Sequence, residues 1–192
     1  MTEEELIRGC IKQDRSAQRM LYEQYFGKMM GICIRFSKNQ LDAKDIFQKA
    51  FRTIFSNPKS FMEENMSRTK NAPPLLLEDW IKKIIIRSAV EHLHENKKEY
   101  FVSSTVNVRD AEKTSSEEIS DDQIITRANI QFILKGLQQL TPSYRAIYNL
   151  HEVDRYSHKE ISSLLDISEY TSMDSLLKAK FNMRRNLARM IR

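Results

Sequence analysis

Apolar residues recur every three or four positions along most of this chain, and that spacing restricts the fold more than any other feature of the sequence. The pattern is typical of amphipathic helices, which bury one stripe of side chains. Two clear stripes are Leu21, Tyr25, Met29, Ile32 and Phe36, and then Ile46, Phe47, Ala50, Phe51, Ile54 and Phe55. Glycine and proline, which interrupt helices, account for only four residues each of the 192. We therefore expect an all-α fold with little or no sheet.

Breaker residues divide the first half of the chain into helices. Residues 3–56 are expected to form two or three helices with a turn at Asn39 to Leu41, and Asn57-Pro58 should end the last of them. Residues 57–74 are rich in polar residues and proline, which predicts an irregular insertion. A long helix is then expected over 76–98.

A change in composition predicts two small helical domains joined by a flexible linker. Residues 109–122 hold two basic residues against six acids and show little apolar periodicity, which is typical of a solvated linker. We place the linker at 99–122. The first domain then covers 1–98 and the second 123–192.

Cap residues predict the helices of the second domain. A first helix over 124–139 ends before Thr141-Pro142, which suits the N-cap and first residue of a helix over 142–152. The remaining signals are a capping box at Ser157 and Glu160, a turn at Asp166-Ile167 and an N-cap at Ser168. A short helix, a turn and a longer helix form a helix-turn-helix.

The last segment of the chain is basic. Residues 171–192 hold six basic residues against one acid, Asp174, whereas the whole chain has a net charge of only +5. A basic helix of this kind can neutralise DNA phosphates. An ordinary helical hairpin with a solvated basic face would produce the same pattern, so this segment alone leaves both readings open.

Several other classes of protein are not indicated by the sequence. Cys10 and Cys33 lack the spacing of a disulfide framework or a zinc site, and His92 and His94 point to different sides of a helix. No catalytic or phosphate-loop motif is present, so we expect no enzyme, no cofactor and no metal. Apolar runs are too short to cross a membrane, and the acidic N-terminus does not resemble a secretory signal. We therefore expect a cytoplasmic protein that is not inserted in a membrane.

Residues 42–51 resemble a segment of bacterial sigma factors of the extracytoplasmic-function class, within the sigma-70 family. They read Asp-Ala-Lys-Asp-Ile-Phe-Gln-Lys-Ala-Phe, where that family has Asp-Ala-Glu-Asp-Leu-Val-Gln-Glu-Val-Phe. Further similarities follow in the family's order over about 4–56, 77–97 and 130–190. They include the Tyr22 and Tyr25 pair, the segment from Trp80 to Leu93, the segment from Leu137 to Arg145, and the helix-turn-helix.

The resemblance implies a transcription initiation factor that binds core RNA polymerase and directs it to specific promoters. The implied partners are the clamp helices of the largest polymerase subunit, the polymerase flap, promoter DNA and an anti-sigma factor. Polymerase binding is expected at Asp42, Asp45, Gln48, Lys49 and Arg52. DNA binding is expected at Trp80, Lys82, Lys83, Arg87, His92, His94, Ser168, Thr171, Ser172, Asp174, Ser175, Lys178, Lys180, Arg184 and Arg185.

Some residues depart from the family pattern and keep alternatives open. Lys44 and Lys49 stand where acids are usual, and Asp174 in the recognition helix repels phosphate but can accept a hydrogen bond from a cytosine amino group. The first alternative is a sigma-like module that occupies polymerase, or is held by a membrane-tethered antagonist, without opening promoters. The second is a free regulator that uses only its helix-turn-helix. Trp80 can stack on a flipped base or belong to the core.

Overall fold

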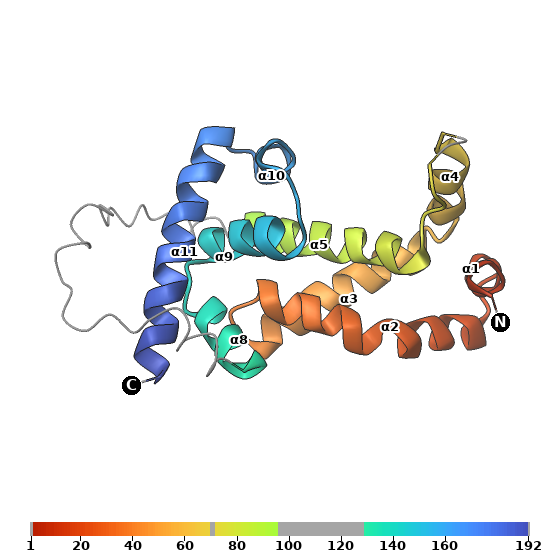
Figure 1. The fold of residues 1–192 in the computed structure, drawn as a ribbon. Coiled ribbons are helices and arrows are strands. Elements are labelled where there is room, and N and C mark those ends of the chain that lie inside the picture. The colour runs from red at the N-terminus through yellow and green to blue at the C-terminus, as the bar shows by residue number, and fades with distance from the viewer. Residues whose placement is uncertain (1, 70–71, 96–128, 192) are drawn as a thin grey trace. The chain divides into compact units, whose positions relative to one another are not determined.

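The computed structural model describes residues 2–69, 72–95 and 129–191, and every regular element in these ranges is a helix (Figure 1). The all-α prediction is therefore confirmed for the part of the chain that the structure describes. None of its helices is long and apolar enough to cross a membrane. The predicted linker at 99–122 lies outside the described residues, as does the predicted helix start at 124.

The chain forms two compact units. The first comprises Met1–Ile34 and Asn39–His92, and the second comprises Arg35–Lys38 and Leu93–Arg192. The last two residues of α2 (Arg15–Phe36) and the last three of α5 (Leu77–Glu95) therefore group with the second unit.

Cap residues set where the helices of the first unit begin. Besides α2 and α5, this unit contains α1 (Glu3–Ile11), α3 (Gln40–Ser56) and α4 (Lys59–Ser67). α1 starts at a capping box of Thr2 and Glu5. α3 starts after Asn39, whose side chain accepts a hydrogen bond from the Asp42 amide at 2.9 Å. The break before α3 thus precedes Gln40, slightly earlier than the predicted turn, because Asn39 acts as the N-cap.

The two predicted apolar stripes supply much of the core of the first unit. Phe47 stacks on Phe51 with ring centroids 4.4 Å apart, and the Tyr22 ring meets both of them edge-on at 5.5 and 5.3 Å. Aromatic packing therefore joins α2 to α3. The buried members of the stripes are Leu21, Tyr25, Met29, Ile32, Ile46, Phe47, Ala50, Phe51 and Ile54, whereas Phe36 and Phe55 are half-buried.

The prediction of an irregular insertion over 57–74 is wrong for half of that segment, because residues 59–67 form α4. The only buried residue of this helix is Phe61, whose ring packs edge-on against Trp80 with centroids 5.6 Å apart. This aromatic contact and the polar contacts of Glu64 and Asn65, rather than an apolar stripe, hold the helix in place. The segment has almost no periodic signal for that reason.

Polar side chains from distant parts of the first unit fix the start of α5. The Asn65 amide donates to the Leu75 carbonyl at 3.3 Å and accepts from its N–H at 2.8 Å. The Glu3 carboxylate accepts a hydrogen bond from the Leu77 amide at 3.2 Å and another from the Tyr25 hydroxyl at 3.4 Å. An acid at the first turn of α5 satisfies an amide that the helix leaves unpaired. Burial, with the nearby carboxylates, raises the pKa of Tyr25 to about 12.

Over residues 129–191 the second unit forms four consecutive helical segments, in which α11 (Glu169–Ile191) packs against α8, α9 and α10 (Figure 1). These are α8 (Ile130–Gln138), α9 (Pro142–Tyr148) with a π-helical extension at Asn149–Val153, and α10 (His158–Leu165). The helix predicted over 142–152 is thus α-helical only in its first part. Thr141 holds the N-cap position of α9, but its side chain makes no cap hydrogen bond. The main core residues are Leu137, Leu140 and Met183, packed by Tyr144, Tyr148 and Leu187.

A buried arginine closes the end of α8. The Arg145 guanidinium, in a residue only 2% exposed, donates to the carbonyls of Leu137, Gln138 and Leu140 at 2.9, 2.9 and 2.8 Å. Carbonyls at a helix C-terminus have no partner within the helix and carry partial negative charge. Arg145 therefore satisfies the end of α8 and ties it to α9.

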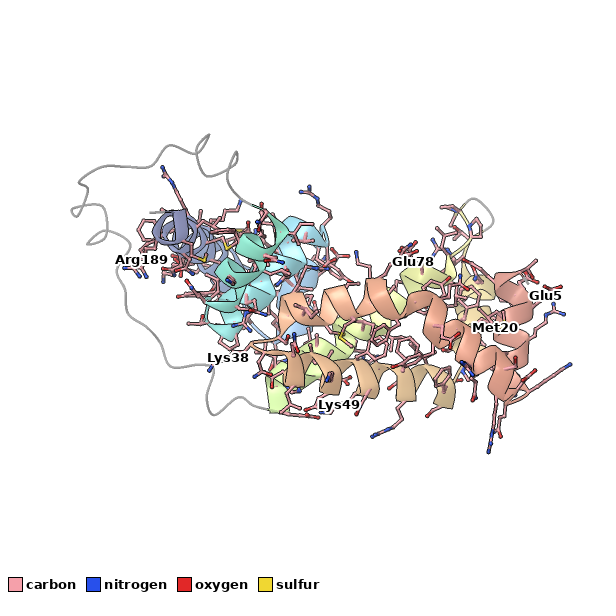
Figure 2. All side chains as sticks on the ribbon, turned by 90° about the horizontal axis from the view of Figure 1, so that it is seen from below. Glu5, Met20, Lys38, Lys49, Glu78 and Arg189 are labelled. Carbon is pink, nitrogen blue, oxygen red and sulfur yellow. The ribbon has the colours of Figure 1, made fainter. Side chains whose placement is uncertain are left out.

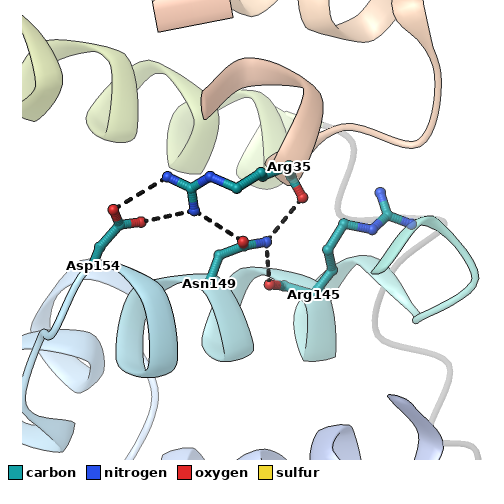
Figure 3. Close-up of polar contacts among 4 residues, drawn as sticks. All are labelled: Arg35, Arg145, Asn149 and Asp154. Carbon is teal, nitrogen blue, oxygen red and sulfur yellow. Dashed lines mark hydrogen bonds and ion pairs between the residues drawn. The ribbon is translucent and has the colours of Figure 1, made fainter. Parts of the chain in front are cut away.

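A second polar cluster of this unit surrounds Asn149 (Figure 3). The Arg35 guanidinium donates to both Asp154 carboxylate oxygens at 3.2 Å and to the Asn149 side-chain oxygen at 3.0 Å. The Asn149 amide donates to the carbonyls of Arg35 and Arg145 at 2.8 and 2.9 Å. The Asp154 side chain is fully buried, so this bidentate pair compensates a charge that would otherwise be costly.

Candidate polymerase-binding and DNA-binding surfaces

Four exposed residues follow one another along α3, on the side opposite its buried residues. This α3 row consists of Leu41, Asp45, Gln48 and Arg52, spaced four, three and four residues apart. Asp42 and Lys49 (labelled in Figure 2) flank the row and are half-buried. The structure thus brings all five residues predicted for polymerase binding to one face of one helix.

The α3 row differs from a purely acidic surface in two ways. Leu41 is 68% exposed and stands in one row with polar residues, and it was not among the predicted binding residues. Its exposure could have been predicted from the sequence, because Leu41 lies just after the N-cap residue and outside the apolar stripe of this helix. The charges of Asp42 and Asp45 are balanced by those of Lys49 and Arg52, and exposed Lys44 adds a further cation.

On α5, the predicted DNA-binding residues do not form one cluster. Lys83 and Arg87 lie on an exposed stripe with Asp79 and Glu91, so the formal charge of the stripe is zero. Arg87 pairs with Glu91 at 3.1 Å, and Lys83 pairs with Glu64 of α4. Lys82 and His92 are half-buried on other sides of the helix.

One α5 prediction needs correction. Trp80 is only 3% exposed and packs on Phe61, so it is a core residue and does not present its ring to a base. Burial of a large indole ring stabilises the fold, and packing against a second aromatic ring adds to that stabilisation. His94 groups with the second unit, where its Nε2 lies 3.4 Å from the Leu164 carbonyl.

The helix-turn-helix is built by caps that the sequence predicts correctly. Ser157 and Glu160 form the capping box of α10, and Asp166 ends that helix in the left-handed conformation with φ of 55°. The Ser168 hydroxyl accepts the Thr171 amide at 3.0 Å and lies 2.8 Å from the Thr171 hydroxyl. Both predicted DNA-binding residues Ser168 and Thr171 are exposed at the start of α11.

Ser172 is a predicted DNA-binding residue that the structure places in the interior. It is fully buried, and its hydroxyl lies 2.9 Å from Nδ1 of His158. The base-contact prediction for Ser172 is therefore wrong in this structure, because the side chain joins α11 to α10. Asp174 and Ser175 are half-buried.

Two cations of α11 pair with carboxylates. Lys178 pairs with Asp174 one turn earlier at 2.7 Å, and this hydrogen bond raises the pKa of Lys178. Lys180 pairs with Glu152 at 2.9 Å, which lowers the pKa of Glu152. The negative charge of Asp174 is thus compensated within the helix, which reduces the repulsion expected from DNA phosphates. Arg184 and Arg185 are exposed farther along α11.

A stacked pair of histidines lies next to these contacts. The rings of His151 and His158 are nearly parallel with centroids 4.5 Å apart, and Nδ1 of His151 lies 2.8 Å from Glu152. Burial lowers the pKa of His158, His151 and Lys180 lower it further, and Glu169 raises it. Among the described residues, no group of three or more histidine, cysteine or acidic side chains could hold a metal ion.

Comparison with known proteins identifies the helix-turn-helix first. A family described as Sigma-70, region 4 matches residues 133–180, which extend from α8 into the first half of α11.

Relatives extend the similarity to nearly the whole chain. The chain is 23% identical to the ECF RNA polymerase sigma factor SigW of Bacillus subtilis, over 96% of this chain and 98% of the relative. It is 23% identical to the ECF RNA polymerase sigma-E factor of Escherichia coli, over 94% and 91% of the two chains. It is also 22% identical to the RNA polymerase sigma-H factor of Pseudomonas aeruginosa, over 93% and 90%. Over more than nine-tenths of its length, the chain is thus similar to bacterial RNA polymerase sigma factors, among them two of the extracytoplasmic-function class.

The fold of this chain is also similar to that of a solved sigma factor. A solved structure of the sigma factor RpoE in complex with the anti-sigma factor NepR, from Bartonella quintana, has a TM-score of 0.51 with 14% identity. The alignment covers 88% of this chain and 96% of the solved one. The resemblance predicted from the sequence is confirmed.

Proposed function

We propose that this protein is a transcription initiation factor that binds core RNA polymerase and directs it to specific promoters. The observation that carries the proposal is the similarity to sigma factors over more than nine-tenths of the chain, together with a capped helix-turn-helix in the matched segment. The protein acts through binding and not as an enzyme. Because its partners are polymerase and promoter DNA, we place its action in the cytoplasm.

The proposal assigns a task to each domain. Residues 1–98 bind the clamp helices of the largest polymerase subunit and the nearer promoter element, and residues 123–192 bind the polymerase flap and the farther element. Residues 99–122 join the two. An anti-sigma factor is a further partner, and the solved relative bound to NepR supports this class of partner.

The α3 row supports polymerase binding through a mixed surface. Asp45 and Gln48 offer acceptors and donors to a partner helix, and Leu41 supplies an apolar anchor at the N-terminal end of the row. Reversing one central charge should therefore weaken the complex without disturbing the fold, because Asp45 is exposed.

Gel filtration of the full chain with core RNA polymerase tests this contact. Wild-type protein should co-elute with polymerase, and Asp45→Lys and Leu41→Ala should each reduce the bound fraction. Glu63→Lys is the matched control, since Glu63 is exposed on α4 and undergoes the same charge change. Equal binding by Asp45→Lys and wild type would remove the α3 row as the docking surface. Absence of any co-elution would count against the initiation factor and favour a free regulator.

The Asp174–Lys178 pair offers a test of duplex binding by α11. Asp174→Asn removes the carboxylate that engages Lys178, so more positive charge becomes available to phosphates. We expect tighter DNA binding by the polymerase complex and a salt dependence steeper by about one counterion. Lys178→Glu should have the opposite effect. If both variants bind DNA like wild type at every salt concentration, α11 does not contact the DNA backbone near this pair.

A second candidate function is a polymerase-bound module that does not open promoters. The neutral stripe on α5 favours it, because Lys83 and Arg87 are paired with carboxylates and Trp80 is buried. Transcription of genomic DNA by the reconstituted complex, with sequenced RNA ends, separates the two functions. Defined start sites that depend on the protein support the initiation factor. Stable polymerase binding without such start sites supports the second function.

A further inference from the structure

The second helix of the helix-turn-helix, α11, exposes an apolar stripe on the side that faces away from the core of its unit. Tyr170, Met173 and Leu177 are 79%, 46% and 67% exposed and lie at positions i, i+3 and i+7 of α11. This spacing places them on one face. The opposite face buries Ser172, Leu176, Ala179 and Met183 in the core of the unit.

The polar residues beside this stripe are largely engaged within the unit: Thr171 is exposed, but its hydroxyl lies 2.8 Å from that of Ser168. Ser172 is buried, and the Asp174 carboxylate is engaged by Lys178. Three apolar side chains thus dominate the first turns of α11, where a helix-turn-helix places the residues that meet base edges. In the major groove, the one apolar group on a base edge is the methyl group of thymine.

We infer that Tyr170, Met173 and Leu177 recognise thymine methyl groups in the major groove of duplex DNA. The inference rests on the proposed promoter binding and specifies the bases that this helix selects. Apolar contact excludes water from the methyl group and favours thymine over cytosine, whose edge lacks that group.

Charge supports DNA over a protein as the occupant of the stripe. From 169 to 191, α11 carries five basic residues, Lys178, Lys180, Arg184, Arg185 and Arg189, against Glu169 and Asp174. The net charge of +3 follows the stripe along the same helix, which suits a polyanion whose phosphates flank the groove. A purely apolar protein partner would gain no attraction from this net positive charge.

The test uses full-length protein bound to core RNA polymerase and a pool of duplexes with a randomised segment. Selected duplexes are then resynthesised with deoxyuridine in place of single thymidines, which removes one methyl group and keeps every hydrogen bond. We expect at least one exchange to weaken binding about fourfold, the effect of one methyl-sized group returned to water. Leu177→Ala or Met173→Ala should abolish this difference. Ile130→Ala, at a residue 77% exposed on α8, is the matched control and should retain it.

Each outcome separates this inference from the proposed function. Sequence-selective binding that ignores every thymidine exchange, or a methyl effect that survives the alanine variants, would overturn thymine recognition and leave promoter binding standing. If the complex selects no duplex sequence, the DNA-directed function and this inference both fail. Because the three side chains are exposed, circular dichroism should show unchanged helicity in every variant.

Discussion

Replacing the buried Arg145 should destabilise the second unit more than any surface substitution. Its guanidinium donates to three carbonyls at 2.8 to 2.9 Å, at the end of α8 and just beyond it. Each hydrogen bond from a charged donor contributes about 1.5–3 kcal/mol, and an apolar replacement leaves these acceptors buried. Methionine avoids the desolvation of a buried cation, which offsets part of that loss. We therefore expect Arg145→Met to lower the free energy of unfolding by about 3–5 kcal/mol.

The assay follows two signals during urea unfolding. Trp80 is the only tryptophan and is buried in the first unit, so its fluorescence reports that unit, whereas far-ultraviolet circular dichroism reports both. In Arg145→Met the dichroism transition should begin at lower urea while the fluorescence midpoint stays near that of wild type. Arg185→Met changes the same side chain at an exposed site of the same unit and should cost no more than about 0.5 kcal/mol. A loss below about 1 kcal/mol for Arg145→Met would refute the assigned role of its hydrogen bonds.

Two further predictions concern pH and close packing. Burial and the stacked His151 ring hold the pKa of His158 below the ordinary value of 6.5, so the unfolded chain takes up a proton more readily. The contribution of His158 to stability is present above pH 6.5 and is lost as the pH falls through the folded-state pKa. The urea midpoint of the wild type should therefore be lower at about pH 5.5 than at about pH 7.5, and the decrease should be smaller in His158→Gln. An equal decrease in both proteins would contradict this cause. In Gly9→Ala the new Cβ would lie 2.5 Å from the Ala17 Cβ, so overpacking of about 1–3 kcal/mol should outweigh the gain in helix propensity. In Gly27→Ala the new Cβ has no atom within 4 Å, so this variant should be more stable by about 0.8–1 kcal/mol. If the thermal midpoints of Gly9→Ala and Gly27→Ala change in the same direction, the packing argument is contradicted.

Sequence patterns predicted those elements whose cause is local. The apolar stripe from Ile46 to Ile54 defines α3, and the Ser157–Glu160 box defines the start of α10, because both signals lie within one or two helical turns. α4 was missed because its stability depends on the contact between Phe61 and Trp80, which are 19 positions apart. The role of Arg145 was equally hidden, since arginine is rarely buried and the carbonyls that hold it become visible only in the fold.

The candidate site shows the same division between local and tertiary causes. Helical spacing was sufficient to place Asp45 and Gln48 on one exposed face. It was not sufficient for Ser172, since the turn before α11 rotates that residue toward His158 and into the core. A helix-turn-helix pattern indicates that a helix is presented, but the angle of the turn decides which of its side chains are exposed.

Ion pairs within both units reduce the electrostatic contribution that these surfaces can make to binding. Lys83, Arg87, Lys178 and Lys180 each pair with a carboxylate of this chain, so a phosphate must replace an existing partner before it adds net attraction. Shape and apolar contact must then supply a larger share of affinity than in a surface of unpaired cations. Exposed Leu41 in the α3 row and the apolar stripe of α11 are the features that can supply it. Their contribution is insensitive to salt, unlike that of phosphate contacts, so the residual affinity at high ionic strength measures it directly.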